Sequence, residues 1–447
     1  MKYFTLFILI FFFVKTYSQE LPKTNPLISK MVSEISVEKI EANIRTLVKF
    51  GTRHTLSDTT SDTRGIGAAR RWIKSQFESY IPSSNGRLSV EYVSGVVPKS
   101  NRIPHTTQIV DVIATLKPGK PDGTNQIFIV SGHYDSRATD AMDSTSDAPG
   151  ADDDGSGTAL VLELARVMSK YEFRSTIVFA AFAGEEQGLF GSTILAETAK
   201  AHGWNIGGVL NNDIVGNIQD GNNTIESTYV RCFSEAYNGL DTGSVFRQRN
   251  MLGLENDGPS RILSRYVKEK GENYVPDLPV HLIFRRDRFL RGGDQTPFHD
   301  RGFAAVRMTE AKENFDRQHQ NVREDKGKKY GDVPEGVNYN YCAHIAQINT
   351  ATIATLSLAP VPPSNPKIMT KELAYDTELH WNQNTEKDLA AYIVRYRATD
   401  TPYWQHAVVC HDTTITLPIS KDDYLFGIQA VDKDGNMSLV VIPRPGR

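Results

Sequence analysis

The sequence predicts an α/β protein whose mostly parallel mixed sheet is covered by helices on both faces, followed by a small C-terminal β-sandwich. Three observations lead to this prediction. Apolar runs typical of buried strands alternate with helical periodicity through the first 358 residues. A proline-rich segment then interrupts the chain, and beyond it the pattern changes to the period-two alternation of half-buried strands. The length of 447 residues also suits two domains better than one.

The first 18 residues have the layout of a signal peptide. Lys2 precedes an apolar run at residues 4–14, and small or polar residues follow up to Ser18 and Gln19. The run is too short to span a bilayer comfortably, and no later segment approaches a membrane span. We therefore expect cleavage near Ser18 and export of the mature protein to a periplasm or to the medium. A buried N-terminal helix or a membrane anchor is the alternative.

Four short apolar runs predict the buried strands of the first domain, which we assign to residues 19–358. These runs are residues 126–130, 176–183, 209–212 and 304–308. Helical periodicity predicts helices at residues 66–77 and 158–168. Strands that alternate with helices in this way favour a largely parallel sheet between two helical layers.

Residues 359–366 contain four prolines in eight positions, which indicates a stiff, extended linker. Tyr392, Val394 and Tyr396 beyond it fall on one face of a strand, and a second strand is expected at residues 424–431. With a strand at Trp381, these features make residues 367–447 resemble a fibronectin type III domain.

Composition excludes some classes of function and leaves others open. Hydrophobic residues make up 39% and charged residues 23% of the chain, which is ordinary for a soluble globular protein. The formal net charge of −3 provides no basic surface of the kind that nucleic-acid binding needs. Cys232 and Cys342 could form one disulfide or remain buried thiols, and Cys410 is left over in either case.

The first chemically suggestive motif is His133-Tyr134-Asp135, which directly follows the strand expected at residues 126–130. Ligands bind at the carboxyl ends of strands in a parallel α/β sheet, so polar side chains at this position suit a site. Two residues apart, His133 and Asp135 can both point toward one centre. A pair of solvated loop residues is an equally good interpretation of this motif by itself.

Three consecutive carboxylates, Asp152 to Asp154, precede the helix expected at residues 158–168. Adjacent like charges repel one another unless cations or helix N-terminal amides compensate them. The flanking glycines at 150, 155 and 157 allow close approach of the backbone and favour a metal-binding turn. The alternative is a helix cap at Asp154 beside two solvated neighbours.

Glu185 and Glu186 follow the strand expected at residues 176–183, and Asp213 follows the strand at 209–212. Paired glutamates at a strand end can divide the work, since one can ligate a metal while the other stays free as a general base. Three strand ends therefore bring oxygen-rich loops and one histidine together. This composition suits zinc, and less well manganese or cobalt.

Taken together, these motifs resemble the zinc aminopeptidases of metallopeptidase family 28, over residues 30–358. The resemblance lies in the order of His-x-Asp, Gly-Ala-Asp-Asp, Glu-Glu, Asn-Asp and a late Pro-Phe. It implies two divalent metals, with His133 and Asp213 on one, Glu186 on the other and Asp152 bridging both. These assignments come from the family pattern and not from the spacing of the residues.

The same resemblance implies a mechanism and a substrate. A hydroxide held between the two cations would attack the peptide carbonyl, Glu185 would act as general base, and Asp135 would orient His133. The expected function is a secreted exopeptidase that cleaves peptides from the amino end. The sequence gives no indication of an oligomeric state.

One departure from the family pattern concerns the last expected ligand. The family has a histidine before x-Pro-Phe, whereas this chain has Gln295 before Thr296-Pro297-Phe298. If residues 296–299 open a helix, His299 lies on the same face as Gln295 and could supply the second metal with an imidazole. Weak ligation by the Gln295 amide oxygen, or no ligation by either residue, are the other possibilities.

Two further functions remain open at this point. A non-catalytic binding or adhesion protein with a decayed metal site is favoured by Gln295 and disfavoured by the paired glutamates. A glutaminyl cyclase-like transferase is disfavoured by the missing histidine. The basic run at residues 285–291 is either a solvated, salt-bridged loop or a carboxylate-binding site.

Overall fold

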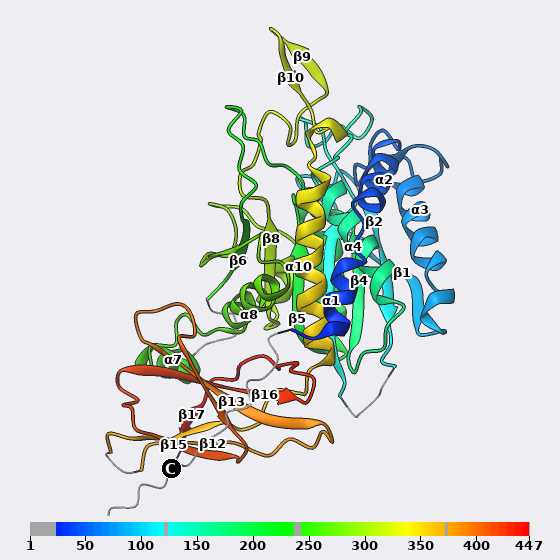
Figure 1. The fold of residues 1–447 in the computed structure, drawn as a ribbon. Helices are drawn as coiled ribbons and strands as arrows, with labels where there is room; N and C mark the ends of the chain where they lie inside the picture. Colours follow the sequence, from blue (N-terminus) through cyan, green and yellow to red (C-terminus); the bar gives the residue numbers. More distant parts are fainter. Residues whose placement is uncertain (1–23, 120–123, 237–242, 372–373, 447) are drawn as a thin grey trace, which may run out of the picture.

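A large mixed β-sheet forms the centre of the molecule, and two smaller sheets lie at its C-terminal end (Figure 1). The computed structural model describes residues 24–119, 124–236, 243–371 and 374–446. The expected signal peptide at residues 1–18 lies outside the described residues. Helices of the described part lack the combination of length and hydropathy that a membrane span requires.

The central sheet has eight strands in the order β1-β2-β4-β3-β5-β8-β6-β7. The strands are β1 Leu88–Val97, β2 Thr107–Leu116, β3 Gln126–His133, β4 Thr176–Phe182, β5 Asn205–Asn212, β6 Val230–Ser234, β7 Val280–Ile283 and β8 Ala305–Thr309. Neighbouring strands among β4, β3, β5 and β8 pair in parallel, whereas β1, β2 and β6 add antiparallel pairs. The four parallel strands are the ones that the apolar runs predicted.

Helices cover both faces of this sheet, as the alternation of apolar runs predicted (Figure 1). They are α1 Pro26–Ser33, α2 Val37–Val48, α3 Gly65–Ser79, α4 Gly155–Met168, α5 Glu185–Gly188, α6 Phe190–Ala201, α7 Gly243–Met251, α8 Pro259–Tyr274, α9 Gln295–Asp300 and α10 Tyr339–Leu358, with short 3₁₀ turns at Pro82–Ser84 and Pro334–Gly336. Side chains of β4 alternate between the two cores because successive residues of a strand point to opposite faces. Ile177 and Phe179 pack with α4 and α10, whereas Val178 and Phe182 pack with α6 and α9.

The C-terminal region is a two-sheet β-sandwich. Its strands are β11 Lys367–Met369, β12 Thr377–His380, β13 Leu389–Ala398, β14 His406–Cys410, β15 Thr414–Leu417, β16 Tyr424–Asp432 and β17 Arg444–Gly446. One sheet has the order β15-β12-β11-β17 and the other β14-β13-β16. Trp381, Tyr392, Val394 and Phe426 share the core between the two sheets, as the period-two pattern predicted.

The second face of β13 packs against the first domain instead of facing water. Arg397 donates to Asp257 Oδ2 at 2.7 Å, and Arg395 donates to Glu269 of α8 at 2.8 Å. Arg397 is 2% exposed, so its charge is compensated by a partner in the other domain. The two regions therefore share a buried polar interface.

Two remaining features complete the fold. A hairpin of β9 (Arg323–Asp325) and β10 (Lys328–Tyr330) projects from the end of the molecule opposite the sandwich (Figure 1). Cys232, Cys342 and Cys410 are all buried and free, so the disulfide considered from the sequence does not form.

Candidate metal centre

The carboxyl ends of the parallel strands β3, β4 and β5 meet at one edge of the central sheet, and the expected site residues lie there. β3 ends at His133, α5 begins at Glu185 just beyond β4, and Asp213 directly follows β5. Adjacent parallel strands bring their carboxyl ends to the same edge, which is why residues far apart in sequence converge.

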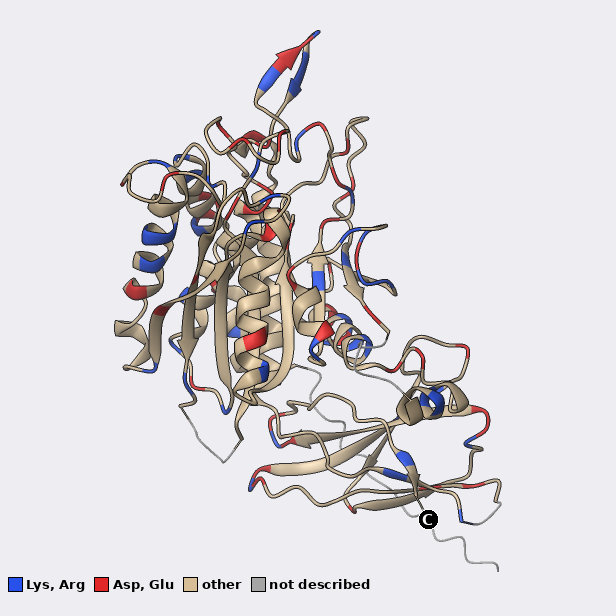
Figure 2. Ribbon diagram, turned by 180° about the vertical axis from the view of Figure 1, so that it is seen from behind, with Lys and Arg blue, Asp and Glu red and all other residues tan. Residues whose placement is uncertain are grey.

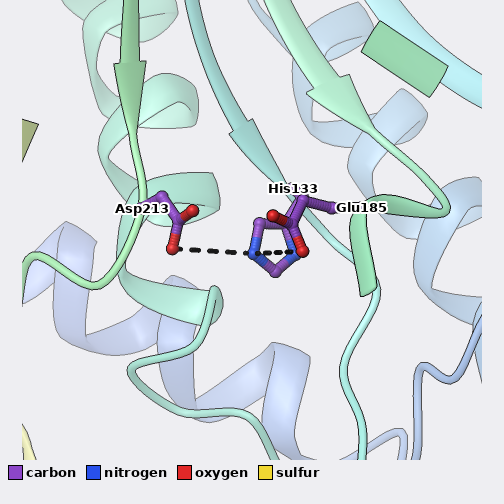
Figure 3. Close-up of side chains that lie close together, drawn as sticks. All are labelled: His133, Glu185 and Asp213. Atoms are coloured by element: carbon purple, nitrogen blue, oxygen red, sulfur yellow. Dashed lines mark ion pairs between the residues drawn. The ribbon is translucent and has the colours of Figure 1, made fainter. Parts of the chain in front are cut away.

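His133, Glu185 and Asp213 form the first cluster of ligand-type side chains (Figure 3). His133 Nε2 lies 3.8 Å from Asp213 Oδ1 and 4.0 Å from Glu185 Oε2. His133 is 1% exposed and Asp213 is 2% exposed, so neither is a solvated loop residue. Their polar atoms face a common point, as side chains that share an ion do.

Asp153, Glu186 and His319 form the second cluster. His319 Nε2 lies 2.9 Å from Glu186 Oε1 and 3.0 Å from Asp153 Oδ2. Gln318 donates to the same Asp153 oxygen at 3.1 Å. Two carboxylates and one imidazole thus converge on a single position.

Asp153 connects the two clusters. Its Oδ1 lies 3.3 Å from His133 Nε2 in the first cluster, while its Oδ2 faces His319 in the second. Burial alone would raise the pKa of Asp153, but the hydrogen bonds to His133 and His319 hold it well below its usual value. The carboxylate between the clusters is therefore ionised.

The structure does not bring Asp152 to either cluster, and the bridging position expected for it belongs to Asp153. Asp152 Oδ1 accepts a hydrogen bond from the Gly216 backbone at 2.7 Å. Asp154 caps α4 by accepting from the Gly157 backbone at 2.9 Å. The expectation for Asp152 was therefore wrong by one residue, because the helix cap fixes which carboxylate points into the site.

Gln295 and His299 do lie in one short helix, α9, but neither reaches the clusters. Gln295 Nε2 donates to Asp287 Oδ2 at 3.0 Å. His299 Nε2 lies 3.2 Å from Glu235, and its Nδ1 lies 3.0 Å from Ser260 Oγ. The hypothesis that either residue ligates the second metal is corrected by these contacts.

His319 is the functional residue that sequence reasoning missed. It lies in the loop that follows β8, ten residues beyond Thr309, and its φ of 55° is uncommon for a residue other than glycine. β8 was among the predicted strands, so a histidine in the loop after its carboxyl end was the available signal. The late Pro-Phe motif drew attention to Gln295 instead.

Asp135 supports the site from behind. Its Oδ1 lies 3.5 Å from His133 Nδ1, and its two oxygens accept from the backbones of Glu185 and Glu186 at 3.3 and 3.2 Å. Thr55 also donates to it at 2.9 Å. One buried carboxylate therefore positions both glutamates together with the imidazole.

Asp213 has its own support in Arg307, which is completely buried. Arg307 Nη2 lies 3.0 Å from Asp213 Oδ1, and Nη1 donates to Asp287 at 3.0 Å. Gln295 donates a hydrogen bond to Asp287, so this glutamine supports the first cluster indirectly, through Asp287 and Arg307. Burial would raise the pKa of Asp213, but Arg307 lowers it overall.

Arg53 fixes the loops that carry the first two motifs. Its guanidinium donates to the backbone carbonyls of Tyr134 at 2.6 Å, Pro149 at 2.5 Å and Gly150 at 2.8 Å. Arg53 is fully buried, and burial lowers its pKa to about 10. The β3 loop and the turn before α4 are therefore tied to the N-terminal segment.

The titratable groups of the clusters have strongly shifted pKa values. Burial raises the pKa of Glu185 well above its usual value. Burial by itself would lower the pKa of both imidazoles. Nearby carboxylates, Glu185 above all, instead raise the pKa of His133 well above its usual value. Glu186 and Asp153 raise the pKa of His319 to about 10. Groups perturbed in this way in a cleft are typical of a functional site.

A pocket of about 520 Å³ opens onto both clusters. Its wall includes four carboxylates of the clusters together with His319 and four arginines. A volume of this size holds one or two amino-acid residues of a ligand.

The side chains present fit a pair of divalent ions. Each cluster offers three ligand atoms within 4.8 Å of one another. Glu186 Oε1 is buried, and its 2.9 Å contact with His319 Nε2 lacks the geometry of a hydrogen bond, as suits two atoms that face a shared ion. Mixed imidazole and carboxylate donors of this kind suit zinc.

Comparison with known sequences identifies relatives over nearly the whole chain. The profile of Peptidase family M28 matches residues 111–330. A probable zinc metalloprotease of Leptosphaeria maculans is 44% identical over 95% of this chain and 98% of its own length. A probable zinc metalloprotease of Pyrenophora tritici-repentis is 43% identical over 93% of this chain and 86% of its own.

Solved structures share the fold at low sequence identity. The LapA aminopeptidase of Legionella pneumophila has a TM-score of 0.51 and 19% identity, covering 73% of this chain and 74% of its own. The aminopeptidase of Aneurinibacillus sp. strain AM-1 has a TM-score of 0.52 and 16% identity, covering 74% and 96%. The likeness to these two structures shows a common fold.

Proposed function

The chain belongs to peptidase family M28 as a zinc metalloprotease, and we propose that it is a secreted aminopeptidase with two zinc ions. The observation that carries this proposal is the position of Asp153 between two ligand clusters at the strand ends. A single carboxylate shared by two triads is what a co-catalytic pair of metals requires. Peptides are its substrates.

We assign the ligands from the contacts of each cluster. His133 and Asp213 would hold one ion, Glu186 and His319 would hold the other, and Asp153, whose two oxygens face the two clusters, would contribute to both. Zinc at these positions would lower the pKa of water to about 7 and polarise the carbonyl of a substrate. If His319 is the last ligand, glutamine at position 295 is no evidence for a decayed metal site. It is also no evidence against a glutaminyl cyclase.

Glu185 is the general base in this proposal. Its carboxylate lies 4.0 Å from His133 Nε2 and borders the pocket, so it reaches the reacting atoms without being needed as a ligand. Burial raises its pKa well above the usual value, which makes the carboxylate a stronger base. Glu185 takes a proton from the attacking water and passes it to the leaving amine.

The preference for chain ends is supported by the size of the pocket. A pocket of about 520 Å³ suits one or two residues, whereas an endopeptidase needs a groove along which the chain runs past the site. The two aminopeptidases that share the fold agree with this proposal. Export, which we infer from residues 1–18, places the enzyme in a periplasm or in the medium.

The test compares free and N-acetylated peptides with the zinc-loaded protein and with the chelated protein. We expect hydrolysis of free peptides from the amino end, no hydrolysis of the acetylated ones, and loss of activity on chelation. Peptides that begin with glutamine separate hydrolysis from cyclisation, because a cyclase gives a pyroglutamyl product of unchanged length. Equal cleavage of blocked peptides, or cyclisation alone, would contradict the proposal.

A further inference from the structure

The wall of the catalytic pocket contains four arginines in addition to the metal clusters. They are Arg102, Arg137, Arg288 and Arg291. The acidic residues of the same wall are Asp153, Glu185, Glu186 and Asp213, each of which belongs to a cluster. Loops at this end of the sheet carry basic and acidic residues side by side (Figure 2).

The positive charges of the arginines and of two bound metal ions exceed the negative charges of the carboxylates in this wall. Two divalent ions bring four positive charges, which the four carboxylates of the clusters balance. Because Arg288 is paired with Asp287 and Glu313, three arginines of the wall, Arg102, Arg137 and Arg291, then remain as an excess of positive charge around the bound ligand. Low-dielectric walls lined by one sign of charge concentrate ligands of the opposite sign.

The arginines differ in how far their own contacts satisfy them. Arg288 donates to Asp287 at 3.1 Å and to Glu313 at 2.9 Å, so it is a structural cation. Arg102 donates to the backbone carbonyl of Glu186 at 2.7 Å. The contacts with Asp287 and Glu313 already satisfy Arg288, whereas Arg102 has no carboxylate partner in the described part of the chain.

Arg137 and Arg291 are the cations that a ligand can use. Arg137 donates only long hydrogen bonds of 3.4 and 3.5 Å to two backbone carbonyls and lies 3.9 Å from Glu186 Oε2. Arg291 is exposed, and its guanidinium makes no hydrogen bond or ion pair with the described residues. A guanidinium presents a planar fork that matches a carboxylate.

We propose that this pocket selects peptides that carry a carboxylate on one of the two residues flanking the scissile bond, and that Arg291 and Arg137 bind it. The carboxylate comes either from an aspartate or glutamate side chain or from the C-terminus of a dipeptide. This inference rests on the proposed peptidase function and adds its substrate class. Of the two interpretations of the basic run at 285–291, it favours the carboxylate-binding site at Arg291.

The first experiment measures kcat/KM of the zinc-loaded protein on three matched pairs of short peptides. Two pairs exchange glutamate for glutamine in the first or second residue, with the C-terminus amidated. The third pair has a free or an amidated C-terminus on otherwise neutral residues, which separates the two sources of the carboxylate. We expect at least one pair to favour the carboxylate about tenfold, the effect of a charged hydrogen bond.

Variants assign that preference to the arginines. Arg291→Ala is expected to reduce the carboxylate preference severalfold, and Arg291→Lys to restore part of it. Arg285→Ala is the matched control, because Arg285 lies in the same loop, stacks on Phe289 and is absent from the pocket wall. A preference that survives both Arg291→Ala and Arg137→Ala, or equal rates within every pair, would overturn the inference.

A binding measurement keeps the inference separate from the proposed function. Calorimetry on the zinc-loaded Glu185→Gln protein compares the affinity of each glutamate peptide with that of its glutamine partner. If none of the peptides is hydrolysed by the wild type, the proposed function fails, while tighter binding of the carboxylate peptides still supports this inference. Equal affinity within all three pairs would overturn it whatever the activity.

Discussion

Single residues decide which of several neighbouring carboxylates does the chemistry. In the run of three aspartates, Asp154 caps α4 and Asp152 accepts from Gly216, which leaves Asp153 to face both imidazoles. The sequence predicts the cluster but not the residue, because the three side chains are chemically identical and their directions depend on the backbone of the turn. The structure brings His133, Glu185, Glu186 and Asp213 to one edge of the sheet because each lies at or just beyond the end of a strand.

At this scale, Glu185→Gln tests the assignment of the general base. The amide is isosteric but cannot accept the proton, so we expect kcat to fall by a factor of 10² to 10⁴. Zinc content should stay at the wild-type value because the substitution leaves the ligands in place. Normal turnover with an unchanged zinc content would remove Glu185 from the mechanism.

The pKa values of the imidazoles make zinc affinity depend on pH. Nearby carboxylates raise the pKa of His133 well above its usual value and that of His319 to about 10 in the metal-free protein. Only the neutral imidazole ligates zinc, so the imidazole protons must leave on binding. We therefore expect apparent zinc affinity to fall as pH is lowered from 8 to 6.

Calorimetric titration of the chelated protein in buffers of different ionisation enthalpy measures the protons released. We expect at least two protons per pair of zinc ions at pH 7, one from each imidazole, because the coordinated water adds a further fraction. Zinc binding that is independent of both pH and buffer would show that these histidines are already neutral, or that they are not ligands.

At the scale of elements, the sequence predicted strands and helices better than their contacts. The apolar runs predicted β3, β4, β5 and β8, since strands buried on both faces are continuously apolar. The helix considered at residues 296–299 does form, but the direction of His299 could not be predicted, because a six-residue helix is oriented by tertiary contacts with Ser260 and Glu235. The sequence pattern of β13 also did not predict that its second face packs on the region of α8.

The contact between β13 and the first domain can be tested by a substitution. Asp257 has no exposed side-chain surface and is held by Arg397 and Arg265. Arg397→Ala leaves the buried carboxylate with one partner, so we expect the free energy of unfolding to fall by about 2 kcal/mol. The control is Lys433→Ala, an exposed position in the same sandwich.

Chemical denaturation of the two variants and the wild type measures the difference. A change of less than about 0.5 kcal/mol in Arg397→Ala, the range usual for surface substitutions, would mean that the interface ion pair adds nothing to stability. A larger loss of unfolding free energy in Lys433→Ala than in Arg397→Ala would also show that the interface ion pair adds nothing to stability.

At the scale of the whole molecule, the metal centre and the sandwich lie at opposite ends of the first domain. The loops of the site face the end from which the β9–β10 hairpin projects, and the sandwich packs at the other end (Figure 1). The fold class could be predicted because strand and helix periodicity differ between the two parts. The interface could not, because Arg395 and Arg397 have the pattern of solvent-facing residues.

A protein truncated at Ala359 separates the contributions of the two parts. All proposed ligands lie between His133 and His319, so we expect hydrolysis of small peptides to continue. The unfolding temperature should fall because Asp257 and Glu269 lose their arginine partners. Loss of activity in a fragment shown by circular dichroism to be folded would mean that the sandwich contributes to the site.

In the proposed ligand set, Asp153 joins two metal positions and His319 completes the second. The most direct test of this ligand set is the zinc content per chain, measured by mass spectrometry after dialysis, of the wild type, His319→Ala and His299→Ala. His299 is the control, since it is also a histidine of the first domain with a carboxylate neighbour but contacts Glu235 and Ser260. The structure predicts two zinc ions in the wild type and in His299→Ala, and one in His319→Ala. Two ions retained by His319→Ala, or a loss confined to His299→Ala, would contradict the account.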